Sequence, residues 1–251
     1  MQWTIDPAYR TKRDSLQGLL EQFEQSSHEL GDGNRNIIRV LPLDKEEVAI
    51  KSFKVPHLVN RWVYRFFRKS KAQRSFEYAQ ILIQKQIGTP APVAFGEEKQ
   101  GLLFGRSVYI SRFVHADLTY RELIHQPDYP NRTELLRAFT RFTFDLHEKG
   151  IHFLDHSPGN TLIVLSASGP VFYLVDLNRM EFGTLDLQTR LKNFSRLTPK
   201  REMVKIMATE YARLIDQDEQ MIFDHMWAYT QAFRKRFENK KKWKRTVLGR
   251  K

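Results

Sequence analysis

The sequence changes character near residue 115, and this change restricts the possible folds more than any other feature. Before it, apolar residues come in short runs bounded by Gly, Pro and Asp, which is typical of β-strands. After it, apolar residues recur every three or four positions, which is typical of amphipathic helices. We therefore predict an α+β fold with two lobes that share a cleft, a β-rich lobe over residues 1–114 and a helical lobe over residues 115–251.

Each lobe divides further into elements by the same patterns. In the helical lobe, Leu135, Phe139, Phe142 and Leu146 share one face of a helix that Gly150 would end. The expected strands are residues 37–41, 48–53, 91–97, 107–114, 161–164 and 171–175. The expected helices are residues 15–28, 72–86 with Gly88 as terminator, 131–150, and the segments beyond Leu187.

The composition narrows the possible partners. The 251 residues include 41 Lys and Arg against 29 Asp and Glu, a net charge of +12, which favours a polyanionic partner such as nucleic acid, anionic lipid or a phosphorylated substrate. The absence of cysteine excludes a disulfide framework and a thiolate metal site. No apolar run approaches the roughly 18 residues that a membrane span needs, and no apolar leader follows the first charges, so we expect a cytoplasmic protein.

Two features of the first lobe suggest a site for phosphate groups. Gly31 and Gly33 precede a strand and would let backbone N–H groups approach a phosphate closely, although a flexible turn is the commoner reason for such glycines. Lys51, at the end of VAIK, alternates out of an apolar strand and can reach into a cleft, where Glu77 on the next helix is a candidate to hold it. A solvated lysine and a surface glutamate are the simpler interpretation.

Three side chains of the second lobe suggest proton transfer and cation binding. Asp155 and Asn160 stand on either side of a Ser-Pro-Gly bend, so an acid that accepts a proton and an amide that binds a cation can converge on one point. The alternative is a turn capped by its own side chains. Asp176 follows a buried strand, which is a common position for a metal ligand, although a helix N-cap is the plainer alternative.

Taken in order, these parts resemble the protein-kinase-like superfamily from about Gly31 to the helices beyond Asp176. VAIK matches the motif of the third strand, and DHSPGN matches the catalytic loop with its proline. Within the superfamily, DHSPGNTLI, LVDLNRM and IGTPAPVAFGE are similar to segments of the bacterial lipopolysaccharide kinases, which phosphorylate Kdo or heptose of the lipid A core. The resemblance implies a bilobal kinase fold that binds ATP and Mg²⁺.

The resemblance also implies a role for each acidic and basic candidate. Asp155 would accept the proton of the acceptor hydroxyl. Asn160 and Asp176 would hold Mg²⁺. Lys51 would contact the α- and β-phosphates and pair with Glu77.

The remaining candidates would bind the nucleotide through the backbone. Gly31 and Gly33 would cover the phosphates. The hinge, whose backbone binds adenine, would include Ser111, Phe113 and His115.

Some positions depart from the usual kinase pattern. Asn178 replaces the glycine of D-F-G, and Asn is the residue other than glycine that best tolerates the left-handed region. Phe153 and Leu154 replace His-Arg, so no arginine stands there to engage a phosphorylated activation loop. No A-P-E follows Asp176, which leaves little platform for a peptide. These departures favour a small-molecule or glycolipid acceptor.

Two segments, residues 60–74 and 234–245, mix basic and aromatic side chains. Such a mixture suits the headgroup layer of an anionic membrane. For residues 60–74 the alternative is a helix face whose aromatics pack on the lobe. For residues 234–245 the alternative is a disordered basic arm that contacts any polyanion.

The sequence therefore predicts an ATP-dependent kinase that phosphorylates a sugar hydroxyl, of Kdo or heptose in the lipopolysaccharide inner core, at the inner face of the cytoplasmic membrane. One alternative is a nucleotide-binding pseudokinase or adaptor, against which Lys51, Asp155, Asn160 and Asp176 argue. The other is a kinase associated with RNA or ribosomes, with nucleic acid as the less favoured polyanion.

Overall fold

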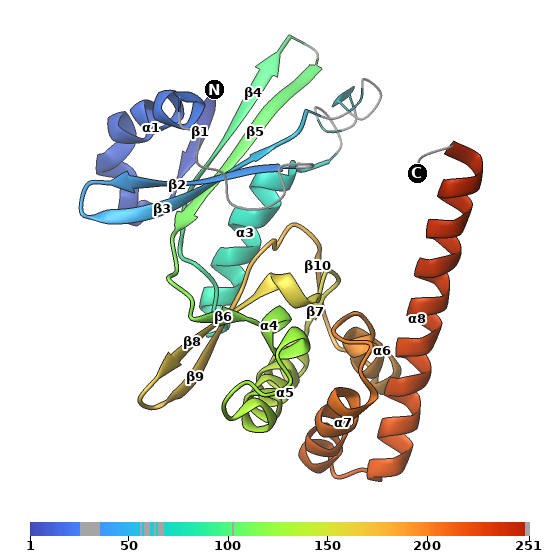
Figure 1. The fold of residues 1–251 in the computed structure, drawn as a ribbon. Helices are drawn as coiled ribbons and strands as arrows, with labels where there is room; N and C mark the ends of the chain where they lie inside the picture. Colours follow the sequence, from blue (N-terminus) through green and yellow to red (C-terminus); the bar gives the residue numbers. More distant parts are fainter. Residues whose placement is uncertain are drawn as a thin grey trace. The chain divides into compact units, whose positions relative to one another are not determined.

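The computed structural model describes residues 1–25, 36–55, 57, 61–62, 64, 68–101 and 103–248 (Figure 1). The chain divides into two compact units. The first contains Met1–His115 and Val175–Asn178, and the second contains Ala116–Leu174 and Arg179–Lys251. The short segment Val175–Asn178 thus belongs with the β-rich part of the chain, although it follows the first strands of the helical part in sequence.

The first unit is built on a five-stranded sheet in the order β1-β4-β5-β3-β2, in which all neighbours are antiparallel. A tight turn with Asp44 at φ 56° joins β2 to β3, because a two-residue hairpin turn needs the left-handed region that Asp tolerates. The strands are β1 (Gln2–Ile5), β2 (Asn36–Leu43), β3 (Glu46–Phe53), β4 (Pro92–Gln100) and β5 (Leu103–Arg112).

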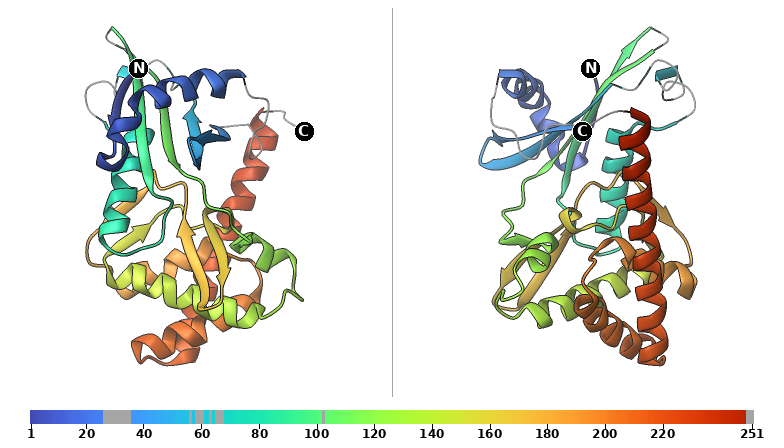
Figure 2. Two further views of the ribbon diagram at one scale, coloured as in Figure 1. Left: turned by 90° about the vertical axis from the view of Figure 1, so that its left-hand side faces the viewer. Right: turned by 45° about the vertical axis from the view of Figure 1, so that its right-hand side comes forward.

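Two helices, α1 (Arg13–Gln25) and α3 (Lys71–Gln84), cover opposite faces of this sheet (Figure 2). The alternation of side chains along β3 decides which helix each residue meets. Val48 and Ile50 share a buried cluster with α1, whereas Phe53 packs with Phe76 of α3. Lys51 therefore lies on the α3 face of β3. A short 3-10 helix, Pro7–Lys12, precedes α1.

The second unit is mainly helical. Its core gathers side chains from every long helix, including Tyr120, Phe139, Leu191, Met207 and Ile222. The helices are α4 (Tyr120–His125), α5 (Arg132–Glu148), α6 (Leu187–Asn193), α7 (Arg201–Ile215) and α8 (Glu219–Leu248), with short 3-10 helices η2 (Pro158–Asn160) and η3 (Phe194–Arg196). The strands are β6 (Leu118–Thr119), β8 (Thr161–Ser166) and β9 (Gly169–Leu174) in one sheet, and β7 (Ile151–Phe153) with β10 (Met180–Phe182) in another.

The predicted α+β fold is confirmed, and some local expectations need correction. Helix α3 ends at Gln84, with Lys85 as its C-cap and Gln86 at φ 56°, so Gly88 lies beyond its end. Residues 234–245 belong to α8 and do not form a disordered arm. Among the described residues, no helix has the length and apolar character needed to cross a membrane.

Candidate functional site

Lys51 and Asp176, which are 125 positions apart in sequence, form an ion pair inside the first unit. Lys51 Nζ donates to Asp176 Oδ1 at 2.6 Å. The lysine side chain is 13% exposed and the aspartate side chain 34%, so the pair lies partly out of water, where its attraction is less screened. The β-strand places the lysine on the α3 face, and its Nζ also lies 5.4 Å from the ring centre of Phe53. The structure thus brings two predicted site residues together.

The backbone at Asp176 lies in the left-handed region, with φ at 60°. This region costs free energy for a residue that has a Cβ, and such residues occur more often at functional sites than elsewhere. Asn178 Nδ2 donates to Asp176 Oδ1 at 2.6 Å and so supports the carboxylate. We expected the left-handed residue at Asn178, whereas the structure has it at Asp176.

Glu77 lies on α3 but does not contact Lys51. Its carboxylate accepts hydrogen bonds from Lys69 Nζ at 2.7 Å and from Gln73 Nε2 at 2.9 Å. Lys51 pairs with Asp176 and Glu77 pairs with Lys69, so the expected Lys51–Glu77 pair does not form in the structure.

The hinge candidates continue directly from β5. Ser111 is buried in the strand, opposite Ala49. The Phe113 amide donates to the Glu47 carbonyl at 2.8 Å, so this N–H is already engaged within the first unit. His115 Nε2 lies 2.7 Å from a Glu47 carboxylate oxygen, and its ring meets that of Phe113 edge to face. Gly31 and Gly33 lie outside the described residues.

In the second unit, the loop between β7 and β8 holds Asp155 and Asn160. Asn160 Nδ2 donates to the Asp155 backbone carbonyl at 2.8 Å across the bend of η2. The amide nitrogen is engaged in this way, and the amide oxygen is an acceptor atom. Gly159 at this bend is packed closely by Arg121 of α4, whose Nη2 would lie 2.7 Å from an added Cβ.

Two arginines engage the Asp155 carboxylate, and both bind the same oxygen. Arg179 Nη1 donates to Oδ1 at 3.1 Å and Arg196 Nη1 donates to it at 2.9 Å. Neither guanidinium engages Oδ2. Neither arginine was among the predicted site residues. Arg179 stands in the quoted LVDLNRM segment and could have been singled out there, whereas Arg196 stands in no recognisable motif.

Two buried histidines are connected through Asn193 to the strand that precedes Asp155. His147 Nε2 and His156 Nδ1 each lie 3.3 Å from Asn193 Oδ1, and Asn193 Nδ2 donates to the Phe153 carbonyl. Burial lowers the pKa of His147 to about 3 and the pKa of His156 to about 4. Both rings are therefore neutral near pH 7. Both are buried, and both lie within hydrogen-bond distance of Asn193.

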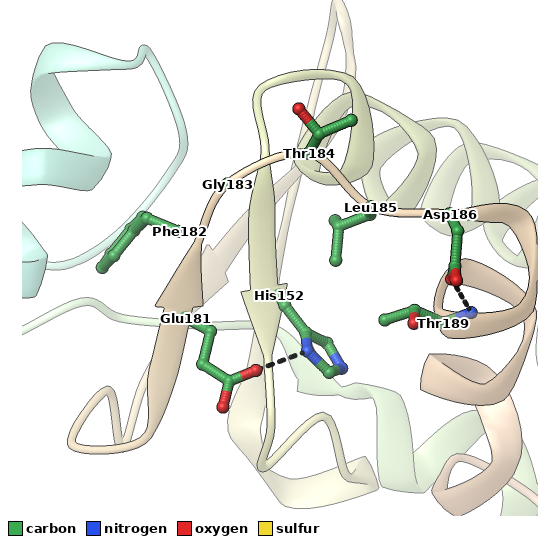
Figure 3. A pocket seen from close by; sticks show the side chains of 8 residues that line it. All are labelled: His152, Glu181, Phe182, Gly183, Thr184, Leu185, Asp186 and Thr189. Carbon is green, nitrogen blue, oxygen red and sulfur yellow. Dashed lines mark hydrogen bonds and ion pairs between the residues drawn. The ribbon is translucent and has the colours of Figure 1, made fainter.

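An open hollow of about 340 Å³ lies beside β7 and β10. Figure 3 shows His152 and Glu181 facing each other across the two strands, with 3.2 Å between His152 Nδ1 and Glu181 Oε2, and Asp186 capping the first turn of α6. The other lining residues are Phe182, Gly183, Thr184, Leu185 and Thr189. None of the predicted site residues lines this hollow.

The two units together define the class of the protein. A β-rich unit with a lysine–aspartate pair and a helical unit with an aspartate–asparagine loop have the architecture of a protein-kinase-like enzyme. A solved structure of WaaP in complex with acyl carrier protein matches this fold with a TM-score of 0.61 and 16% sequence identity, over 92% of this chain and 99% of that chain. At this identity the match shows the fold alone.

The family follows from the sequence. The model of the lipopolysaccharide kinase (Kdo/WaaP) family matches residues 53–217, about two thirds of the chain, and the chain belongs to this family. It is thus a kinase of the group that phosphorylates sugar hydroxyls of the lipopolysaccharide core. A search of curated proteins gives no match. Lys51 stands two residues before the matched range and α8 follows it.

Proposed function

We propose that the protein transfers the γ-phosphate of ATP to a hydroxyl of Kdo or heptose in the lipopolysaccharide inner core. The observation that carries this proposal is the Lys51–Asp176 pair at 2.6 Å. In such a pair, an anionic phosphate can take the place of the aspartate beside Lys51. A cation can take the place of the lysine beside Asp176, whose backbone lies in the left-handed region. Phosphoryl transfer depends mainly on such positioning and on charge stabilisation.

The available donor atoms suit Mg²⁺. The Asp176 carboxylate and the Asn160 amide oxygen are hard oxygen ligands, and Mg²⁺ is commonly bound by one or two such groups together with substrate phosphates. When bound, Mg²⁺ would neutralise charge on the transferred phosphoryl group.

Asp155 is the proposed general base. Its Oδ2 is not engaged by either arginine and can accept the proton of the acceptor hydroxyl as that oxygen bonds to the γ-phosphorus. The bond from the γ-phosphorus to the bridging oxygen breaks, and ADP leaves. Lys51 neutralises the α- and β-phosphates during this step.

The remaining nucleotide contacts are also proposals. Gly31 and Gly33 would cover the phosphates, and the segment with Ser111, Phe113 and His115 would bind adenine through its backbone. Glu77 would be the partner of Lys51 in a nucleotide-bound state.

Transfer of labelled phosphate from ATP to a lipid A–core acceptor, with Mg²⁺, tests the proposal. Wild-type protein is expected to label the acceptor, and Asp155→Ala is expected to lose the transfer while still binding nucleotide. Full transfer by Asp155→Ala would reject Asp155 as the base. Mg-ATP binding without transfer to any lipopolysaccharide sugar would favour the pseudokinase alternative.

We further propose that the protein docks on the anionic inner face of the cytoplasmic membrane through α8. From Arg234 to Trp243 the sequence has six Lys and Arg and one Glu. Phe237 and Trp243 are both 61% exposed on this helix. Exposed aromatics among cations suit a lipid headgroup layer, where both kinds of side chain are favourable. Residues 60–74 support the packed alternative in part, because the ring centre of Tyr64 lies 5.9 Å from that of Phe104 on β5.

Vesicle binding at one fixed salt concentration tests this docking. Wild-type protein should bind vesicles that contain anionic phosphatidylglycerol and not vesicles of phosphatidylcholine alone. Replacing Lys240, Lys241 and Lys242 by Gln should weaken binding by up to about 100-fold, since each basic residue near the surface contributes about 1 kcal/mol. The same triple change at Lys45, Lys54 and Lys192 is the control. Equal losses in both triple variants, or tighter binding to RNA than to the anionic vesicles, would reject the proposal.

A further inference from the structure

Arg196 binds both the side chain of Asp155 and the backbone beside it. Its Nη1 donates to Asp155 Oδ1 at 2.9 Å and to the Leu154 carbonyl at 2.8 Å. A guanidinium is planar and rigid, so two bonds from one nitrogen fix the carboxylate relative to the backbone that carries it. Arg179 cannot do this as well, because its side chain is 56% exposed and its guanidinium bonds to the carboxylate alone.

Arg196 is itself fixed by the elements around it. It ends η3, whose Phe194 is buried, and the preceding Asn193 donates to the Phe153 carbonyl on β7. Its Cζ lies 5.7 Å from the ring centre of Phe233 on α8. Its Nε is buried and has no hydrogen-bond partner among the described residues, so the plane of the group is set by the Nη1 bonds and by the Phe233 ring.

We propose that Arg196 is a positioning residue for Asp155 and that Phe233 of α8 holds Arg196 in place. The inference rests on the proposed role of Asp155 as the base. By binding Oδ1, Arg196 turns Oδ2 toward the acceptor hydroxyl. Helix α8 thereby supports the catalytic loop, although it lies outside the part of the chain that the family model matches.

Steady-state phosphate transfer from ATP to a lipid A–core acceptor tests the role of Arg196. Arg196→Ala is expected to lower kcat on the order of 100-fold, because misplacing a catalytic group by about 1 Å can cost that much. The KM for ATP should stay within about twofold, since Arg196 contacts no proposed nucleotide ligand. Added guanidinium ion should restore part of the lost kcat in Arg196→Ala and have no such effect on wild-type protein. Arg196→Lys, which keeps a cation but not the fork, should be intermediate.

Arg201→Ala is the matched control. Arg201 lies 5.1 Å from the ring centre of Phe223, so it makes the same kind of contact with the same helix but does not bind the catalytic loop. Its kcat should be unchanged. Phe233→Ala should lower kcat by about threefold, the size of a cation–π contact, and should add nothing to Arg196→Ala in the double variant.

Amide hydrogen exchange gives a second measurement that needs no acceptor. Amides of residues 154–160 should exchange faster in Arg196→Ala and in Phe233→Ala, and at the wild-type rate in Arg201→Ala. If Arg196→Ala does not fold, Arg196→Lys and Phe233→Ala carry both measurements.

The outcomes separate this inference from the function it rests on. An inactive Asp155→Ala with a fully active Arg196→Ala would overturn the inference alone. A fully active Asp155→Ala would overturn the base as well. A lower kcat without guanidinium rescue and without faster loop exchange would show that Arg196 acts on stability only, and would also overturn the inference.

Discussion

Asp155 and Asp176 each stand two residues beyond a strand, but the structure holds them differently. Asp176 pairs with one flexible lysine and sits in left-handed backbone. Asp155 is engaged by two arginines, one of which also binds the adjacent backbone. The Asp155 side chain is 17% exposed and that of Asp176 34%.

The difference separates a group that changes partner from a group that stays in place. A lysine is a point charge on a flexible stem and can move to a phosphate without disturbing the strand that carries it. A guanidinium with two bonds holds its partner in one orientation. The pairing of Asp176 thus suits a ligand that exchanges as nucleotide enters, and the pairing of Asp155 suits a base with a fixed direction.

The largest expected effect on phosphate transfer comes from removing the charge of Asp155 while keeping its hydrogen bonds to the two arginines. In Asp155→Asn, Oδ1 can still accept from both arginines, and only the proton-accepting Oδ2 is replaced. We expect phosphate transfer to fall by about 10²–10⁴-fold, the usual contribution of a general base. Nucleotide binding, measured by calorimetry, should be unchanged. Near-wild-type transfer would mean that Asp155, like Asp176, acts through a partner other than the acceptor.

The contrast between these two aspartates was only partly predictable. VAIK and DHSPGN singled out Lys51, Asp155 and Asn160 as candidates because those motifs are short and contiguous. The pairing of Lys51 with Asp176 in this structure was not predicted, because a choice between Glu77 and Asp176 depends on distances across the fold that no local spacing encodes. No sequence pattern pointed to Arg196 for the same reason, since its bonds to Leu154 and Asp155 join residues about 40 positions away.

The fold was more predictable than the site. Strands and helices follow local periodicity, and the observed β2, β3, α5 and β8 agree closely with the expected ranges. The N-terminal β1 was missed, because a strand of 4 residues is too short to show alternation and is defined by its pairing with β4.

A second prediction concerns two buried histidines near Asp155, His147 and His156. Their folded-state pKa values of about 3 and 4 are below the unfolded value of about 6.5. The stability gained from keeping them neutral is complete above pH 6.5 and is lost as the pH falls toward 4. Between these values the free energy of unfolding should fall by up to about 1.4 kcal/mol per pH unit for each histidine.

Urea unfolding at pH 7.0, 6.0 and 5.0 measures this loss. His156→Asn should flatten the pH dependence, and His225→Asn, which changes an exposed histidine, should not. A pH dependence that is the same in wild type and His156→Asn would show that the loop support does not titrate through His156.

A third prediction concerns the exchangeable pair. Asp176→Asn should weaken Mg-dependent ATP binding by at least about 10-fold, because the cation would lose a charged oxygen ligand and keep only a neutral amide oxygen. ATP binding measured without Mg²⁺ should be unchanged or slightly tighter, since Lys51 is then released from its carboxylate partner. Equal weakening with and without Mg²⁺ would place Asp176 in the fold rather than at the cation.

The smallest expected effect is at Glu77, and it decides whether Lys51 exchanges partners within the first unit. The Glu77 pair with Lys69 is largely exposed, and exposed pairs contribute about 0–1 kcal/mol to stability. If Glu77 takes Lys51 once nucleotide is bound, as proposed, Glu77→Gln should lower kcat by up to about fivefold, because a pair of this kind contributes about 0–1 kcal/mol. Lys69→Gln removes only the exposed pair with Glu77 and is the matched control, with kcat expected to be unchanged. Equal kcat in Glu77→Gln and Lys69→Gln would show instead that Lys51 moves only between Asp176 and phosphate.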